Sequence, residues 1–201
     1  SSGRYGLGSK DTTPDQIKAV YDNSADVEGY KPRFTIGIND DVTHLSLETC
    51  GKLDSAPAGT ISCKFWGLGS DGTVGANKNS IKIIGDHTDK YAQAYFSYDS
   101  KKSGGVTVSH LRFGDTPIKS AYLINQADFV ACHNESYITK YDMVEDVKPG
   151  GTFLLNCQWP VEELDERLPG QVKRYIAQNN IKFYIINGID IGKKIGLGSR
   201  I

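Results

Sequence analysis

The chain has 201 residues, of which 38% are hydrophobic, and this length is enough to bury a core in one or two domains. Its 23 Lys and Arg residues balance 24 Asp and Glu residues, so a net charge of -1 offers no broad positive field for a nucleic acid partner. No stretch approaches the roughly 20 apolar residues of a membrane span, so we expect no membrane partner.

The first 59 residues are predicted to contain one helix and one strand between less regular segments. Residues 1–13 have no periodic pattern and are predicted to be a linker-like N-terminal segment. A helix is predicted over 14–23, because Pro14 suits the first turn of a helix and apolar residues follow at helical spacing. An apolar run over 34–38 predicts a buried strand, and residues 43–59 are predicted to be a loop.

From residue 60 onward, strand patterns alternate with helix patterns. Strands are predicted at 60–66, 91–98, 106–113, 128–132, 152–156 and 182–186, and helices at 81–85, 115–126, 161–168 and 171–178. This alternation predicts an α/β fold: a layered, Rossmann-like arrangement with a largely parallel or mixed sheet flanked by helices. We see no internal boundary, so residues 14–201 are predicted to form a single α/β domain.

A glycine-rich loop between a predicted strand and a predicted helix is the most specific local pattern. The loop matches G-x-G-x-x-G, and its candidate anion-binding residues are Gly67, Gly69, Ser70, Gly72, Thr73 and Lys78. Glycines allow close approach to an oxyanion, and a helix N-terminus supplies free N–H donors. The alternative is a tight turn with no ligand. A P-loop is excluded because Asn77 occupies the position of its second glycine. A dinucleotide site is weakly supported, because no acid follows at the expected spacing.

A second turn with similar ingredients lies near the N-terminus. Its candidate residues are Gly6, Leu7, Gly8, Ser9 and Lys10, which combine turn glycines with a hydroxyl and an ammonium group. The alternative is a flexible linker end. We rank this turn slightly above the G-x-G-x-x-G loop, because it is short and cationic.

Candidates for catalysis and metal binding are few. The histidines His44, His87, His110 and His133 are scattered, and each is expected to be structural or exposed. Cys132 and His133 are adjacent on a predicted strand, where their side chains point to opposite faces and cannot share a proton. The four cysteines form no CxxC pair, so we predict no metal site and reduced thiols in a cytoplasmic protein. We also predict no catalytic residue in this chain.

Three longer segments resemble one known family. They are YGLGSKDTTP at 5–14, KFWGLGSDGTVGANK at 64–78 and YFSYDSKKSGG at 95–105, with DDVT at 40–43 and SHLRFG at 109–114. Together they resemble the third, gamma-subunit-like domain of single-chain pyruvate:ferredoxin (flavodoxin) oxidoreductases. The resemblance covers essentially the whole chain. Gly-Ser-Asp-Gly at 69–72 favours the single-chain type, since separate gamma subunits carry a Gly-Gly-Gln-Gly style loop.

The resemblance implies a role for the chain within a larger enzyme. Such enzymes oxidatively decarboxylate pyruvate to acetyl-CoA and pass electrons to ferredoxin or flavodoxin. Thiamine diphosphate, Mg²⁺ and iron–sulfur clusters are expected on other domains of the parent, which is expected to be a homodimer. This domain is expected to contribute to coenzyme A binding and domain assembly, with no turnover alone. Two alternatives stay open: an NAD-binding oxidoreductase subunit, and an interdomain scaffold that binds no small ligand.

Overall fold

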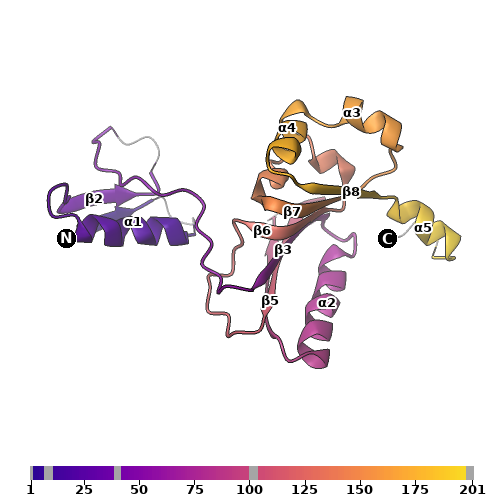
Figure 1. The fold of residues 1–201 in the computed structure, drawn as a ribbon, viewed down its shortest axis with the longest axis horizontal. Helices are drawn as coiled ribbons and strands as arrows, with labels where there is room; N and C mark the ends of the chain where they lie inside the picture. The colour runs from indigo at the N-terminus through magenta and orange to yellow at the C-terminus, as the bar shows by residue number, and fades with distance from the viewer. Residues whose placement is uncertain (1, 7–10, 39–41, 100–103, 198–201) are drawn as a thin grey trace. The chain divides into compact units, whose positions relative to one another are not determined.

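The computed structural model describes residues 2–6, 11–38, 42–99 and 104–197, and the chain divides into two compact units. Unit 1 is Ser1–Ser55 and unit 2 is Ala56–Ile201 (Figure 1). The sequence predicted a linker followed by one domain from residue 14. The structure instead gives the first 55 residues a unit of their own, because the segment before the first helix pairs with a later strand.

Unit 1 is a small βαβ arrangement. Strand β1 (Ser2–Tyr5) leads into helix α1 (Pro14–Ala25), and strand β2 (Arg33–Ile36) returns to pair in parallel with β1. Gly3 lies opposite Phe34, and a Cβ at Gly3 would come within 2.2 Å of the Phe34 ring. The predicted linker at 1–13 therefore contains a strand, whose glycine makes room for a core aromatic residue instead of adding flexibility.

Unit 2 contains a six-stranded sheet in the order β4-β5-β3-β6-β7-β8. Strands β3, β6, β7 and β8 are mutually parallel, whereas β5 runs antiparallel to both of its neighbours, β3 and β4. The strands are β3 (Ile61–Leu68), β4 (Tyr91–Tyr98), β5 (Val106–Gly114), β6 (Ala127–Cys132), β7 (Val147–Asn156) and β8 (Lys182–Ile186). The sheet is mixed, and each predicted strand is present.

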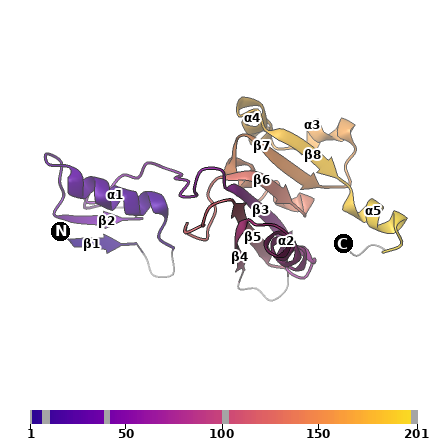
Figure 2. The ribbon, with the colours of Figure 1, turned by 60° about the horizontal axis from the view of Figure 1, so that its bottom comes forward.

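Helices cover both faces of this sheet. Helix α2 packs against β3, β4 and β5, and helices α3 and α4 lie on the opposite side (Figures 1 and 2). The helical elements are α2 (Thr73–His87), η1 (Glu135–Tyr137), η2 (Met143–Asp146), η3 (Val161–Glu163), α3 (Leu164–Arg167), α4 (Gly170–Gln178) and α5 (Gly188–Lys194). The main core lies between the α4 side and the sheet, where Phe153, Leu155 and Val130 are fully buried. This is the layered α/β architecture that the sequence predicted.

The predicted helix over 115–126 is wrong. That segment is irregular, and its carbonyl groups bond to a buried arginine instead of to amides one helical turn away. Arg112 donates from Nη1 to the Ala121 carbonyl at 2.6 Å and from Nη2 to the Leu123 carbonyl at 3.1 Å. The Ile124 amide donates to His110 Nδ1 at 3.1 Å. Two side chains on β5 therefore satisfy the backbone that a helix would otherwise have satisfied.

Smaller differences concern helix boundaries. Helix α2 begins at Thr73, eight residues before the predicted start, and helix α5 was not predicted. All four cysteines are free, with Cys50 exposed and the other three buried. Within the described ranges, no helix is long and apolar enough to cross a bilayer.

Candidate functional site

The packing and backbone geometry of the 67–72 loop explain its three glycines without a ligand. A Cβ at Gly67 would lie 2.5 Å from Thr73 Oγ1, so this glycine allows the start of α2 to pack onto β3. The Gly69 amide donates to the Gly105 carbonyl at 2.8 Å, which ties the loop to the segment before β5. Gly72 is the N-cap of α2, and its φ of 93° is a backbone conformation that residues other than glycine rarely adopt.

Asp71 occupies the position where a bound anion would sit. Its Oδ2 accepts the Leu68 amide at 2.8 Å, and its Oδ1 accepts the Thr73 amide at 2.7 Å. A carboxylate at a helix N-terminus also complements the positive end of the helix dipole. The carboxylate oxygens thus take up the Leu68 and Thr73 amides, two donors that a phosphate bound in this turn would otherwise use.

Two further observations count against a nucleotide phosphate in this loop. Lys78 lies within α2, and its Nζ is 5.5 Å from the centroid of the Phe96 ring on β4. Strand β5 lies between β3 and β4, so an acid after β4, such as Asp99, stands two strand spacings of about 4.8 Å from the loop instead of one. The dinucleotide alternative therefore loses its geometric support.

A second feature lies beside this loop, at the carboxyl ends of the parallel strands. His133 follows β6, and its Nδ1 is 2.7 Å from Thr73 Oγ1. Burial lowers the pKa of His133 below its usual range, against an opposing effect of the Asp71 charge. A cavity of about 260 Å³ opens here, and it is lined by Leu68, Asp71, His133, Asn134, Glu135, Asn156, Cys157, Gln158 and Ile189. We call it the strand-end pocket.

The N-terminal candidate turn connects β1 to α1 in unit 1. Of its five residues, only Gly6 lies within the described ranges; Leu7, Gly8, Ser9 and Lys10 lie outside them. The Gly6 amide donates to the Ile36 carbonyl at 2.9 Å, and the Cβ position of Gly6 is 3.2 Å from the Gly37 carbonyl oxygen. Glycines at the carboxyl ends of two adjacent parallel strands therefore stand side by side, which is where α/β folds bind ligands.

The start of α1 is held close to the end of β1. The Tyr5 hydroxyl is 2.8 Å from Gln16 Oε1, which also accepts the Thr13 amide at 3.1 Å. These contacts fix both ends of the connection that carries Lys10 in the sequence. Strand β1 and helix α1 therefore flank a connection whose sequence is rich in glycine and contains Lys10.

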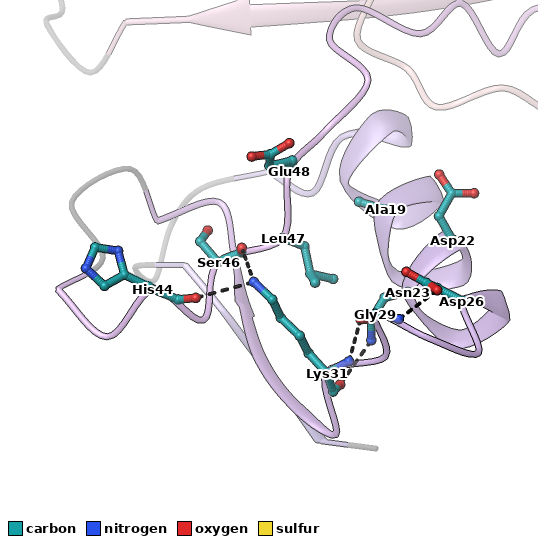
Figure 3. Close-up of a pocket in the computed structure, with 10 residues that line it drawn as sticks. All are labelled: Ala19, Asp22, Asn23, Asp26, Gly29, Lys31, His44, Ser46, Leu47 and Glu48. Atoms are coloured by element: carbon teal, nitrogen blue, oxygen red, sulfur yellow. Dashed lines mark hydrogen bonds between the residues drawn. The ribbon is translucent and has the colours of Figure 1, made fainter.

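Unit 1 also contains a groove between α1 and residues 44–48 (Figure 3). Lys31 reaches across it, and its Nζ donates to the carbonyls of His44 at 3.3 Å and Ser46 at 3.2 Å. The groove also carries the carboxylates of Asp22, Asp26 and Glu48. The Lys31 ammonium group donates to backbone carbonyls, so among the described lining residues no cation is placed to hold a phosphate.

The structure thus separates the predicted site residues. One group lies at the β3–α2 turn, where Asp71 accepts the Leu68 and Thr73 amides. This group comprises Gly67, Gly69, Ser70, Gly72 and Thr73. Gly6 belongs to a different unit. Sequence reasoning missed the part played by Asp71, although an acid just before a helix is a known capping signal. It also missed the pairing of His133 with Thr73, which are 60 residues apart in sequence.

Comparison with known proteins agrees with this architecture. Residues 62–201 match the family described as pyruvate ferredoxin/flavodoxin oxidoreductase. The pyruvate:ferredoxin oxidoreductase of Moorella thermoacetica is 64% identical over 199 residues, which cover 99% of this chain and 17% of that protein. The chain therefore belongs to the pyruvate ferredoxin/flavodoxin oxidoreductase family, and it spans about a sixth of the length of this relative.

Solved structures share the fold at low sequence identity. Subunit PORC of the pyruvate oxidoreductase from Thermotoga maritima is 18% identical, with a TM-score of 0.54 over 71% of this chain and 70% of that one. The 2-oxoglutarate:ferredoxin oxidoreductase of Magnetococcus marinus, solved with 2-oxoglutarate, coenzyme A and succinyl-CoA, is 15% identical. Its TM-score is 0.50 over 72% of this chain and 22% of that one.

Proposed function

We propose that this chain is the coenzyme A-handling domain of an enzyme that oxidatively decarboxylates pyruvate. Coenzyme A carries a diphosphate and a 3′-phosphate, and it requires a loop that offers amides and positive charge. The observation that carries the proposal is the β1–α1 connection, where Gly6 and Gly37 meet at the carboxyl ends of two parallel strands and Lys10 follows in sequence. The other candidate loop already holds the carboxylate of Asp71.

The rest of the reaction belongs to other parts of the proposed enzyme. Within the described residues, no group of three or more His, Cys, Asp or Glu side chains could hold a metal ion. Thiamine diphosphate, Mg²⁺ and iron–sulfur clusters would be bound elsewhere in a homodimeric parent, which would reduce ferredoxin or flavodoxin. Four free cysteines fit a reducing compartment, and the proposal places the enzyme in the cytoplasm.

Coenzyme A titration of variants tests this assignment. We expect Lys10→Ala to weaken coenzyme A binding to the chain by roughly tenfold in isothermal titration calorimetry, because one charge-assisted phosphate contact is lost. The matched control is Lys78→Ala, within α2 beside Phe96, and it should leave the affinity unchanged. In the complete oxidoreductase, Lys10→Ala should raise the KM for coenzyme A and leave the KM for pyruvate unchanged. Equal heats for wild type and Lys10→Ala would remove Lys10 from the site.

A further inference from the structure

We propose that the strand-end pocket of unit 2 binds a neutral, amide-bearing ligand, and that the pantetheine arm of coenzyme A is that ligand. The inference rests on the proposed function for the identity of the ligand, but it concerns a separate site within unit 2. The preference for a neutral group follows from the polar atoms of the pocket lining that make no hydrogen bond within the described part of the chain.

The orientation of His133 defines the first of these atoms. The Thr73 side chain is buried, and the described residues offer its hydroxyl no acceptor other than His133 Nδ1, at 2.7 Å. The hydroxyl therefore donates to Nδ1, which places the ring proton on Nε2. With a lowered pKa, the ring is uncharged at neutral pH. No described residue accepts from Nε2, so His133 presents a neutral N–H donor to the pocket.

Two side-chain amides add donors of the same kind. Asn134 Oδ1 accepts the Ser136 amide at 3.1 Å, which leaves the Nδ2 group of Asn134 as its free end. The side chain of Gln158 has no hydrogen bond to the described residues, and both residues line the pocket. Asn156 is held by the fold at both ends of its amide, because its Nδ2 donates to the His133 carbonyl and its Oδ1 accepts the Gly188 amide, which leaves one N–H of Nδ2.

The charges around the pocket select against anions. Its lining contains no Lys or Arg, and it contains the carboxylates of Asp71 and Glu135. Both oxygens of Asp71 are hydrogen-bonded to amides, and Glu135 Oε2 accepts the Gln158 amide at 3.0 Å, so one carboxylate oxygen is left as an acceptor. Several donors, one acceptor and no cation suit a group with carbonyl oxygens and an N–H. Leu68 and Ile189 add apolar contact for its carbon chain.

The pantetheine arm of coenzyme A meets these requirements, since it is uncharged and carries two amides, a hydroxyl and a terminal thiol on a flexible carbon chain. The phosphate-bearing half of coenzyme A does not meet them. The proposal therefore predicts that fragments of coenzyme A distinguish the two sites of the chain: pantetheine responds to changes in the strand-end pocket, and 3′,5′-ADP responds to changes at Lys10.

The test measures the binding of these two fragments to the full chain by ligand-observed NMR. We expect His133→Leu to weaken pantetheine binding roughly fivefold, because one neutral hydrogen bond is lost, and His133→Gln to restore it by supplying a donor near the Nε2 position. Neither variant should change the affinity for 3′,5′-ADP. His87→Ala, at the exposed end of α2, is the matched control, and thermal unfolding verifies that each variant is folded.

If His133→Leu does not fold, Thr73→Val keeps the imidazole and removes only the hydroxyl that orients it. We expect a roughly threefold weaker pantetheine affinity in that case. Unchanged pantetheine binding in these variants, or no binding to the wild-type chain, would overturn the inference. A loss of 3′,5′-ADP affinity in His133→Leu would also contradict it, since the pocket would then hold anions. A failure of Lys10→Ala to affect 3′,5′-ADP would count against the proposed function alone.

Discussion

The Asp71 carboxylate and the Thr73 amide form a 2.7 Å hydrogen bond at the first turn of α2. The other oxygen of Asp71 accepts the Leu68 amide, so one side chain bridges the end of β3 and the beginning of the helix. A G-x-G-x-x-G pattern commonly leaves these amides for a ligand. Here the Leu68 and Thr73 amides are satisfied within the chain, and the loop connects β3 to α2 through the Asp71 carboxylate.

Removing this bridge should destabilise the chain. We expect Asp71→Ala to lower the free energy of unfolding by about 2 kcal/mol, because two amides lose a charged acceptor. Urea denaturation measures the change. Asp86→Ala is the matched control, since Asp86 is exposed near the end of α2, and a change within about 0.5 kcal/mol is expected there. A similar small change for Asp71→Ala would contradict the bridging role.

Two glycines near this bridge should respond in opposite directions to alanine. A Cβ at Gly67 would lie 2.5 Å from Thr73 Oγ1, so we expect Gly67→Ala to destabilise the chain by about 1–3 kcal/mol through overpacking. Gly75 is inside α2 with nothing within 4 Å of its Cβ position, so Gly75→Ala should stabilise the chain by about 1 kcal/mol. Thermal unfolding compares the stability of each variant with that of the wild type. A Gly67→Ala protein as stable as the wild type would refute the close packing.

The segment 115–126 should depend on Arg112. Arg112 is 3% exposed, and its guanidinium donates to the carbonyls of Ala121 and Leu123 and to Gln93 Oε1. We expect Arg112→Met to cost about 3 kcal/mol, because buried acceptors lose their donor. Hydrogen exchange at the Ile124 amide should accelerate in the same variant. Arg174→Met, at an exposed position of α4, should change neither quantity. Unchanged exchange at Ile124 would show that the segment is held by other contacts.

Stability should fall as the pH is lowered from 6.5. Burial, together with the nearby charges of Lys64 and Arg112, lowers the pKa of His110 to about 3. Since the folded pKa lies below the unfolded value of 6.5, the unfolded state binds the proton more tightly. The contribution of His110 is therefore complete above pH 6.5 and is lost as the pH falls toward 3, at up to about 1.4 kcal/mol per pH unit.

His110→Gln tests this dependence, because glutamine retains an acceptor for the Ile124 amide and does not titrate. Between pH 6.5 and 5, we expect urea denaturation to give a smaller slope of stability against pH for this variant than for wild type. The pKa of His133 is also lowered, so part of the slope should remain. His87→Gln serves as the control and should keep the wild-type slope. An undiminished slope in His110→Gln would contradict the assignment.

The sequence predicted the strands of unit 2 well because each is a short apolar or alternating run with a local signal. It did not predict that 115–126 is irregular, because the groups that satisfy its backbone, Arg112 and His110, belong to another strand. The strand β1 was hidden for a similar reason, since its four residues gain their stability from pairing with β2. The candidate loops were found from their glycines, but the role of Asp71 depends on which amides its carboxylate reaches, and residue spacing does not encode that.

The assignment of the coenzyme A phosphates to the β1–α1 connection is tested most directly by NMR titration of the isotope-labelled chain with 3′,5′-ADP, the phosphate-bearing half of the ligand. We predict that the backbone amide signals of Gly6 and Lys10 shift during the titration, while those of Leu68 and Thr73, bonded to Asp71, keep their positions. Shifts at Leu68 and Thr73 without any at Gly6 and Lys10 would contradict the account, since the ligand would then have displaced the internal carboxylate from the G-x-G-x-x-G loop.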